Sequence, residues 1–173
     1  MRASLLVLLA ALAAAAPAQA VRATVDHDKD ADFTKYKTYT RAAGTPARNE
    51  LNQKRIDAAL EAQLSAKGLT RVESGGDLTV VTHAASETST RVRVDDYGYG
   101  YYPGYWRSVP MTTVDVYEVV VGSVVVDLVD TATDQLVWRG EATDTVSPGI
   151  KPEKVEKIIN KAMEKLFRQY PPK

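Results

Sequence analysis

Cysteine is absent from this 173-residue chain, and histidine occurs only twice. Without a thiol the protein can form no disulfide, and it cannot carry a lipid anchor on a cysteine at a processed N-terminus. Neither sign of charge is in excess, because 22 Lys and Arg balance 22 Asp and Glu. This balance gives no electrostatic reason to expect nucleic acid as a partner.

Motifs of the common enzyme classes are also missing. The chain contains no G-x-S-x-G sequence and no Gly-rich phosphate loop before a helix, and only His27 and His83 could serve as an imidazole base. Asp95 and Asp96 are adjacent, so an extended backbone would point their side chains to opposite faces. We therefore expect no catalytic residues and a protein that is not an enzyme.

The stretch VDHDKDAD is the strongest candidate for a metal site, because aspartates recur at every second position from Asp26 to Asp32. A calcium loop of the EF-hand type would need glycine where Ala31 stands and glutamate where Lys37 stands. Zinc would need more histidine, cysteine or clustered carboxylates. We interpret the aspartates as a solvated strand end with turns, and we expect neither metal nor cofactor.

The N-terminal sequence MRASLLVLLAALAAAAPAQA is typical of a secretory signal peptide. An apolar run from Leu5 to Ala16 is followed by an A-x-A site that predicts cleavage between Ala20 and Val21. The run is shorter than the roughly 20 residues of a spanning helix and is followed by Pro17. We expect residues 1–20 to be a signal peptide and 21–173 to be one exported domain, periplasmic or associated with the cell envelope.

Two segments have helical periodicity. The first is predicted at about residues 49–67, with Asn49 as N-cap and Gly68 as the C-terminal stop; its apolar positions are Leu51, Ile56, Ala59, Leu60 and Leu64. The second is predicted at about 152–170, with Pro152 in its first turn; its apolar positions are Val155, Ile158, Ile159, Ala162, Leu166 and Tyr170. Each helix needs an apolar sheet face to cover.

Strand patterns fill the rest of the chain. A first strand is predicted to end near Asp26, an extended piece lies around residues 36–40, and another strand begins at Leu78 and continues as a polar, extended arm through SETSTRVRVDD. The order strand, helix, antiparallel strands, helix predicts an α+β fold with an antiparallel sheet covered by two helices.

A C-terminal three-strand meander is predicted from VDVYEVVVGSVVVDLVD and QLVWRGEATDTV. Gly122-Ser123 fits a type II′ hairpin turn, which would place Val121 opposite Val124 and Glu118 opposite Asp127. A second turn over residues 130–135 would add Arg139 to that outer row as a charge triplet. The predicted inward positions are Tyr117, Val119, Val121, Val124, Val126, Leu128, Leu136 and Trp138.

The stretch DDYGYGYYPGYW holds five of the nine tyrosines and one of the two tryptophans, interrupted by three glycines and a proline. Its aromatic residues are the candidate ligand or partner contacts: Tyr97, Tyr99, Tyr101, Tyr102, Tyr105 and Trp106. They could form a binding platform, sit at a membrane interface without spanning it, or fold back to cover the sheet. The sequence leaves all three roles open.

Several segments together resemble one bacterial envelope family, domain of unknown function 4136. They are DADFTKYKTYT, LSAKGLTRVESGGDLTVVTH, the Tyr/Gly-rich loop, VVVDLVDTATDQLVWRGEATDTV and a terminal helix that ends in Pro-Pro. The resemblance implies an envelope-associated protein and supplies no catalytic residues. Many members look like lipoproteins with a cysteine at the mature N-terminus, which this chain lacks.

We therefore expect a non-enzymatic binding or structural module of the cell envelope, with an envelope protein, peptide or glycan as partner. The alternative is a small periplasmic hydrolase or glycan-modifying enzyme. A pocket that joined His27 or His83 to a carboxylate and a hydroxyl would favour that alternative.

Overall fold

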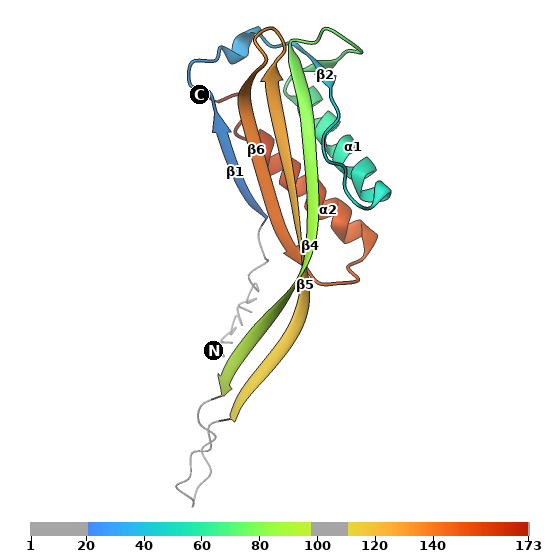
Figure 1. Cartoon of the computed structure of the whole chain (residues 1–173), viewed down its shortest axis with the longest axis vertical. Helices are drawn as coiled ribbons and strands as arrows, with labels where there is room; N and C mark the ends of the chain where they lie inside the picture. The colour runs from blue at the N-terminus through green and yellow to red at the C-terminus, as the bar shows by residue number, and fades with distance from the viewer. Residues whose placement is uncertain (1–20, 98–110, 173) are drawn as a thin grey trace, which may run out of the picture.

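The computed structural model describes residues 21–97 and 111–172, and it confirms an α+β fold (Figure 1). A six-stranded sheet is covered on one face by two helices that also contact each other. The strands are β1 (Arg22–His27), β2 (Thr38–Arg41), β3 (Thr70–Arg71), β4 (Leu78–Tyr97), β5 (Met111–Asp130) and β6 (Gln135–Val146). The helices are α1 (Glu50–Ala66), α2 (Pro152–Phe167) and the short 3-10 helix η1 (Phe33–Lys35).

The strand order is β1-β6-β5-β4-β2-β3. The three pairs β1–β6, β6–β5 and β5–β4 are antiparallel, as predicted. β2 is parallel to both β4 and β3, so the sheet is mixed and not wholly antiparallel. The reason is the connection through α1, because a helix between two strands returns the chain in the same direction.

Both helices begin and end close to the predicted residues. The side chain of Asn49 accepts hydrogen bonds from the backbone N–H groups of Leu51 and Asn52 at 2.9 and 3.2 Å. Gly68 follows α1 with φ of +80°, a left-handed conformation that glycine adopts without strain. Pro152 stands in the first turn of α2, where its missing N–H is not needed.

The core lies between the sheet and the two helices. Alternate residues of the central strands point to it, among them Leu78, Val80, Val126 and Leu128, which are fully buried. α1 contributes Ile56, Ala59, Leu60 and Leu64, whereas α2 contributes Ala162, Met163, Leu166 and Phe167. The predicted helix position Leu51 is 59% exposed and lies outside this core.

Trp138 is the largest fully buried side chain. Its ring centroid lies 5.2 Å from that of Phe167 and 5.8 Å from that of Tyr170, with the Tyr170 ring edge-on. The indole N–H has no hydrogen-bond partner within the described part of the chain. Packing against aromatic neighbours therefore holds this ring in place.

The predicted hairpin turn at Gly122-Ser123 is wrong. These residues lie in the middle of β5, where Gly122 pairs with Ser86 of β4 and Asp144 of β6. The valines on both sides can continue one strand as easily as form two, and the polar arm of β4 supplies a partner for its whole length. The three-strand meander is therefore β4, β5 and β6, and Val121 does not face Val124.

This register keeps one pair of the predicted charge triplet. Asp127 is opposite Arg139, and the guanidinium donates to both carboxylate oxygens at 2.6 Å. Glu118 instead lies opposite Thr90, nine residues along the same strand from Asp127. The turn at residues 131–134, between β5 and β6, is confirmed.

The predicted inward positions are confirmed in part. Val124, Val126, Leu128 and Trp138 belong to the core, whereas Val119 is buried outside the core cluster. Val121 is half-buried, and Tyr117 and Leu136 are 41% and 44% exposed. The mispredicted turn explains Tyr117 and Val121, and a register shift after Leu128 puts Leu136 outside the core.

Substitution at Trp138 and Arg139 tests the two faces of β6. Trp138→Ala should lower the free energy of unfolding by roughly 3–5 kcal/mol, because it removes a fully buried ring. Arg139→Ala should cost less, about 1–2 kcal/mol, because the Arg139 side chain is half exposed, although its loss leaves the buried Asp127 carboxylate without this donor. Denaturant unfolding of both variants measures the difference, and equal losses would contradict this assignment of faces.

Candidate functional site

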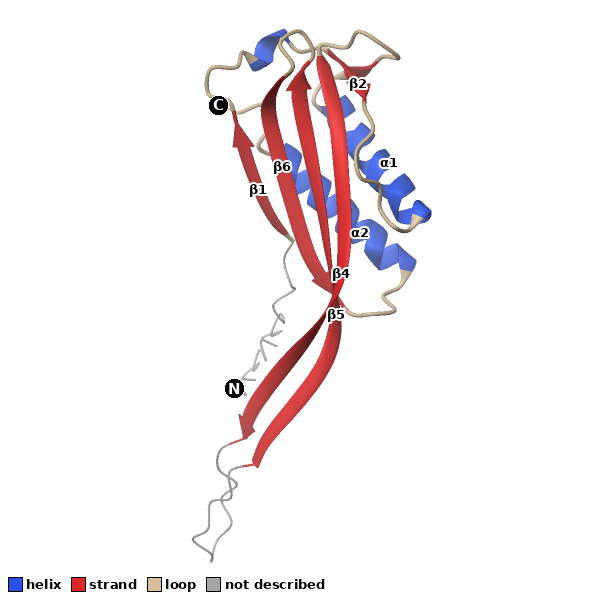
Figure 2. Ribbon diagram, viewed as in Figure 1, coloured by secondary structure: helices blue, strands red, loops and turns tan. Residues whose placement is uncertain are grey.

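A two-stranded arm leaves the body of the protein (Figure 2). It consists of residues 89–97 of β4 paired with 111–119 of β5. β6 ends at Val146, opposite Val120, and β2 pairs with β4 only as far as Val80. Within the described residues, both outer edges of the arm therefore have unpaired backbone groups.

One face of the arm is apolar. Val92 lies opposite Val116, and Val94 lies opposite Val114. The four side chains are 61%, 65%, 58% and 56% exposed, respectively. By alternation along the strands, they lie on the same side of the ladder as the core positions Val80 and Val126. The side of the ladder that the helices cover in the body therefore becomes apolar again in the arm, beyond an interval in which it carries Ser86, Thr88, Thr90 and Glu118.

The opposite face of the arm is charged. Arg91 lies opposite Tyr117, and Arg93 lies opposite Asp115. The guanidinium carbon of Arg93 is 5.9 Å from the centre of the Tyr117 ring, within the range of a cation–π contact. The arm is therefore amphipathic: the four valines lie together on one face, with the polar pair Thr90 and Glu118 next to them toward the body, and the two arginines lie on the other face.

The predicted aromatic contacts fall, with one exception, outside the described residues. Tyr97 is the last residue of β4, and Tyr99, Tyr101, Tyr102, Tyr105 and Trp106 lie outside the described residues. The predicted polar, extended arm leading to them is confirmed as the second half of β4. β4 and β5 thus carry the ends of this segment away from the core.

A cavity of about 280 Å³ lies where the arm meets the body. Its walls come from β4, β5 and β6 on one side and from the N-terminal halves of α1 and α2 on the other. Small residues line the sheet side, namely Ala84, Ser86, Gly122 and Ala142. These small side chains leave space between the sheet and the helices, whereas further along the same face Leu78, Leu128 and Trp138 fill it.

The histidines do not form a catalytic group. Nδ1 of His83 accepts the backbone N–H of Thr45 at 3.2 Å and lies 3.0 Å from the Thr45 hydroxyl. Within the described residues no carboxylate bonds to either imidazole, and neither ring lines the cavity. His27 instead packs edge-on against Phe33, with ring centres 6.2 Å apart.

Three of the four aspartates of VDHDKDAD accept local hydrogen bonds, beginning with Asp26, which accepts the N–H of His27 at 2.9 Å. Asp28 accepts the N–H of Asp30, and Asp32 caps η1 by accepting the N–H and hydroxyl of Thr34 at 2.9 and 2.6 Å. The hydrogen bonds from Thr34 lower the pKa of Asp32. In residues 21–97 and 111–172, no three His, Asp or Glu side chains come close enough together to hold a metal ion.

Asp130 is the carboxylate with the most donors. Its Oδ2 accepts from Lys35 Nζ at 2.7 Å and from the Tyr36 hydroxyl at 2.8 Å. Its Oδ1 accepts the N–H groups of Ala132 and Thr133 at 2.9 and 3.2 Å. These four donors hold the pKa of Asp130 well below its usual range although the residue is buried, and the hydrogen bond from Lys35 has the largest effect.

Asp130 and its neighbour Asp77 fasten the segment before β2 to the sheet. Asp77 accepts the backbone N–H groups of Lys37 and Thr38, both at 2.8 Å, and these bonds lower its pKa. Burial, more than the bond to Asp130, raises the pKa of the Tyr36 phenol. Both oxygens of the ionised Asp130 carboxylate are occupied by donors, which suits a structural role in holding the segment before β2 against the sheet.

The family model described as Domain of unknown function (DUF4136) matches residues 23–172. The chain belongs to the DUF4136 family. No curated protein matches it.

Two solved structures have a similar fold. A DUF4136 family protein from Bacteroides thetaiotaomicron is 15% identical, with a TM-score of 0.50 over 84% of this chain and 95% of that one. A PDZ domain protein from Parabacteroides distasonis is 16% identical, with a TM-score of 0.57 over 90% of this chain. The chain spans only 37% of the PDZ domain protein. Identities this low show a shared fold alone.

Two features of this DUF4136 protein were missed in the sequence, namely the valine face and the cavity. The alternation RVRV and VDV signals an apolar face on the arm, but it was interpreted only as a polar extension. Small residues inside strands signal the cavity. They fall together only in the correct register, which the predicted turn at Gly122 obscured.

Asp130→Asn tests the structural role of the carboxylate cluster. Because folding lowers the pKa of Asp130, its contribution to stability is complete above the ordinary pKa of about 3.9 and is lost as the pH falls below it. The native protein should therefore lose more free energy of unfolding between pH 6 and pH 3 than Asp130→Asn loses. Urea unfolding at both pH values measures this, and an identical loss would contradict the role.

Proposed function

We propose that the protein is an exported, non-enzymatic interaction module of the cell envelope that binds another polypeptide through the arm. The observation that carries the proposal is the uncovered valine face, formed by Val92, Val94, Val114 and Val116. The N-terminal signal-peptide pattern supports export. None of the described helices is long and apolar enough to cross a bilayer.

The arm suits a protein partner for two reasons. A lone two-stranded ribbon is only marginally stable in water, so a partner that covers it would add stability. Its unpaired edges offer backbone hydrogen bonds to an added strand, while the valine face offers apolar area. A glycan would suit the aromatic residues of the sequence DDYGYGYYPGYW but would leave the valines and both edges unused.

The non-enzymatic part of the proposal rests on how the polar groups are used. His83 is engaged by Thr45, and the four donors to Asp130 occupy both of its oxygens. The cavity is lined by neither histidine, so it does not join an imidazole to a carboxylate and a hydroxyl.

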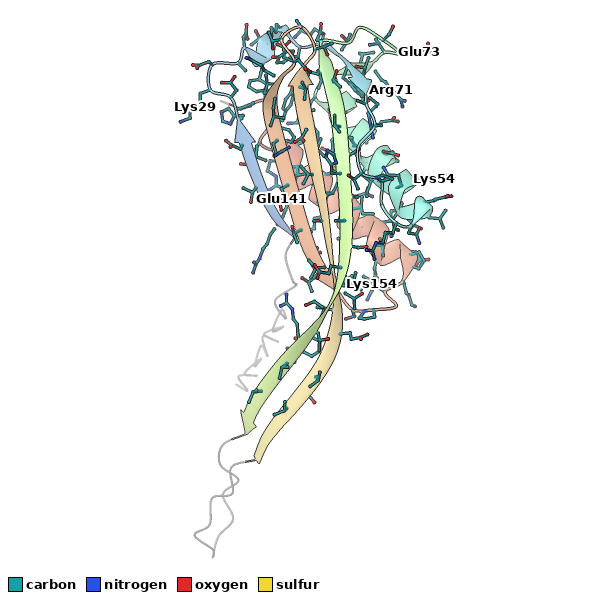
Figure 3. The ribbon with its side chains drawn as sticks, viewed as in Figure 1. Lys29, Lys54, Arg71, Glu73, Glu141 and Lys154 are labelled. Carbon is teal, nitrogen blue, oxygen red and sulfur yellow. The ribbon has the colours of Figure 1, made fainter. Side chains whose placement is uncertain are left out.

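Site-specific crosslinking in cells tests both the location and the surface. A photoreactive residue at Val92 or Val116 should capture a discrete envelope polypeptide. The same residue at Lys29 or Glu73, exposed at the opposite end of the molecule, should not (Figure 3). Capture of cytosolic proteins would contradict export, and capture of lipid or glycan alone would contradict a polypeptide partner.

The double variant Val92→Thr with Val116→Thr should lose the captured polypeptide when the crosslinker stands at Val94. Threonine keeps the β-branched shape, and both valines are more than half exposed, so the melting temperature should stay nearly unchanged. Leu136→Thr is the matched control, because it alters an exposed apolar residue of the body. Equal capture by the double variant and the control would contradict the proposal.

A further inference from the structure

The cavity at the base of the arm has an apolar wall on both sides. Ala84, Val124 and Ala142 line it from the sheet. Ile56 of α1 and Val155, Ile158, Ile159 and Ala162 of α2 line it from the helices. Such a surface favours hydrocarbon over water, because an apolar cavity gives a bound water few hydrogen-bond partners.

Gly122 shows that the sheet side of the cavity is hollow. A Cβ built on this glycine would meet no heavy atom within 4 Å. Gly122 has no positive φ, so its backbone conformation does not require glycine. Glycine inside a strand often marks a place where a ligand approaches closely, and here it faces the helices by alternation with Val124 and Val126.

The dimensions of the cavity match one extended hydrocarbon chain. The β5 wall runs from Val120 to Val124, a length of about 13 Å at roughly 3.3 Å per residue. A volume of about 280 Å³ along that length suits a slender apolar ligand.

The lining of the cavity includes one cation and one carboxylate. Arg48 is exposed, and within the described chain it donates to no hydrogen-bond or ion-pair partner. α2 begins beside the lining residues 147–150 with no side chain capping its N-terminus, and Lys154 lies in its first turn near the base of the arm (Figure 3). Asp144 lies opposite Gly122 in the ladder, and its carboxylate accepts the backbone N–H of Thr145 at 2.8 Å; because it repels an anion, a negative head group has to lie beside Arg48 and away from Asp144.

We infer that this cavity binds one unbranched aliphatic chain of about ten carbons with an anionic head group beside Arg48. The apolar walls take the chain, whereas the guanidinium and the positive end of the α2 dipole favour the negative head. This site is separate from the valine face of the arm and does not depend on the proposed polypeptide partner.

Titration calorimetry with decanoate tests the inference on the purified protein. Decanoate should bind at one site per chain, and butyrate, which is too short to fill the cavity, should bind at least tenfold more weakly. Arg48→Gln should weaken decanoate several-fold while leaving the binding of uncharged decanol unchanged. Failure of decanoate to bind saturably would overturn the inference.

Gly122→Leu is the sharpest variant, because its side chain enters the space that the ligand would occupy. It should lose decanoate binding by at least tenfold without lowering the melting temperature, and Ser86→Leu, across the ladder from it, provides a second block. Val125→Phe adds bulk to the opposite face of the same strand and should bind normally. Normal binding by both blocking variants would place decanoate elsewhere and refute this site.

A free fatty acid and a phospholipid both offer an acyl chain with an anionic head group. Binding of the protein to vesicles of anionic phospholipid would identify a lipid as the source, whereas binding of decanoate without binding to vesicles would identify a free fatty acid. The arm variant Val92→Thr with Val116→Thr should bind decanoate as the native protein does, so failure at one site can be told from failure at the other.

Discussion

The length of β4 and β5 is the constraint on which the rest of this structure depends. Each strand has 20 residues and spans about 66 Å, whereas the 17-residue α1 and the 16-residue α2 span about 25 Å each. Two helices of this length can bury only part of the sheet face. The remaining ladder has to leave the body as a ribbon with its apolar side uncovered.

The two candidate sites follow from that mismatch. Where both helices begin, small residues on the sheet leave a cavity beneath them, and Gly122 marks its floor. Beyond the helices the alternation continues, so Val92 and Val116 keep the side of the ladder that is buried in the body. A surface of this kind on an isolated ribbon is typical of an interaction site.

The body and the arm differ in what holds them together. In the body, Trp138 packs with Phe167 of α2 and with Tyr170, and the cluster around Asp130 ties the segment before β2 to the sheet. In the arm, the described part of the chain gives each strand only the other as a partner, with a contact such as Arg93 over Tyr117 on the charged face. Stability therefore falls along the ladder from the body toward the tip.

Local signals predicted the elements well, since capping by Asn49, the stop at Gly68 and the start at Pro152 depend only on nearby residues. The pairing of Asp127 with Arg139 was predicted from a turn centred on Thr133, but in the structure Asp130 pairs with Gln135, and the register shift between Leu128 and Val129 brings Arg139 opposite Asp127. The strand conformation of Gly122-Ser123 was not predictable, since glycine and serine fit both a tight turn and a strand that lines a cavity. Only the length of the partner strand decides between them, and that is a property of the whole sheet.

The ladder of β4 and β5 continues out of the body, bending where the two strands cross in Figure 1, and does not fold back over the sheet. The absence of cysteine allows spin labels to be placed at Thr79→Cys and Arg93→Cys, both on β4 and both on the face away from the helices. Pulsed electron spin resonance should give one distance somewhat below about 46 Å, the length of 14 strand residues at about 3.3 Å each without a bend. A distribution centred well below this value, in the range of a folded-back arm, would contradict the account.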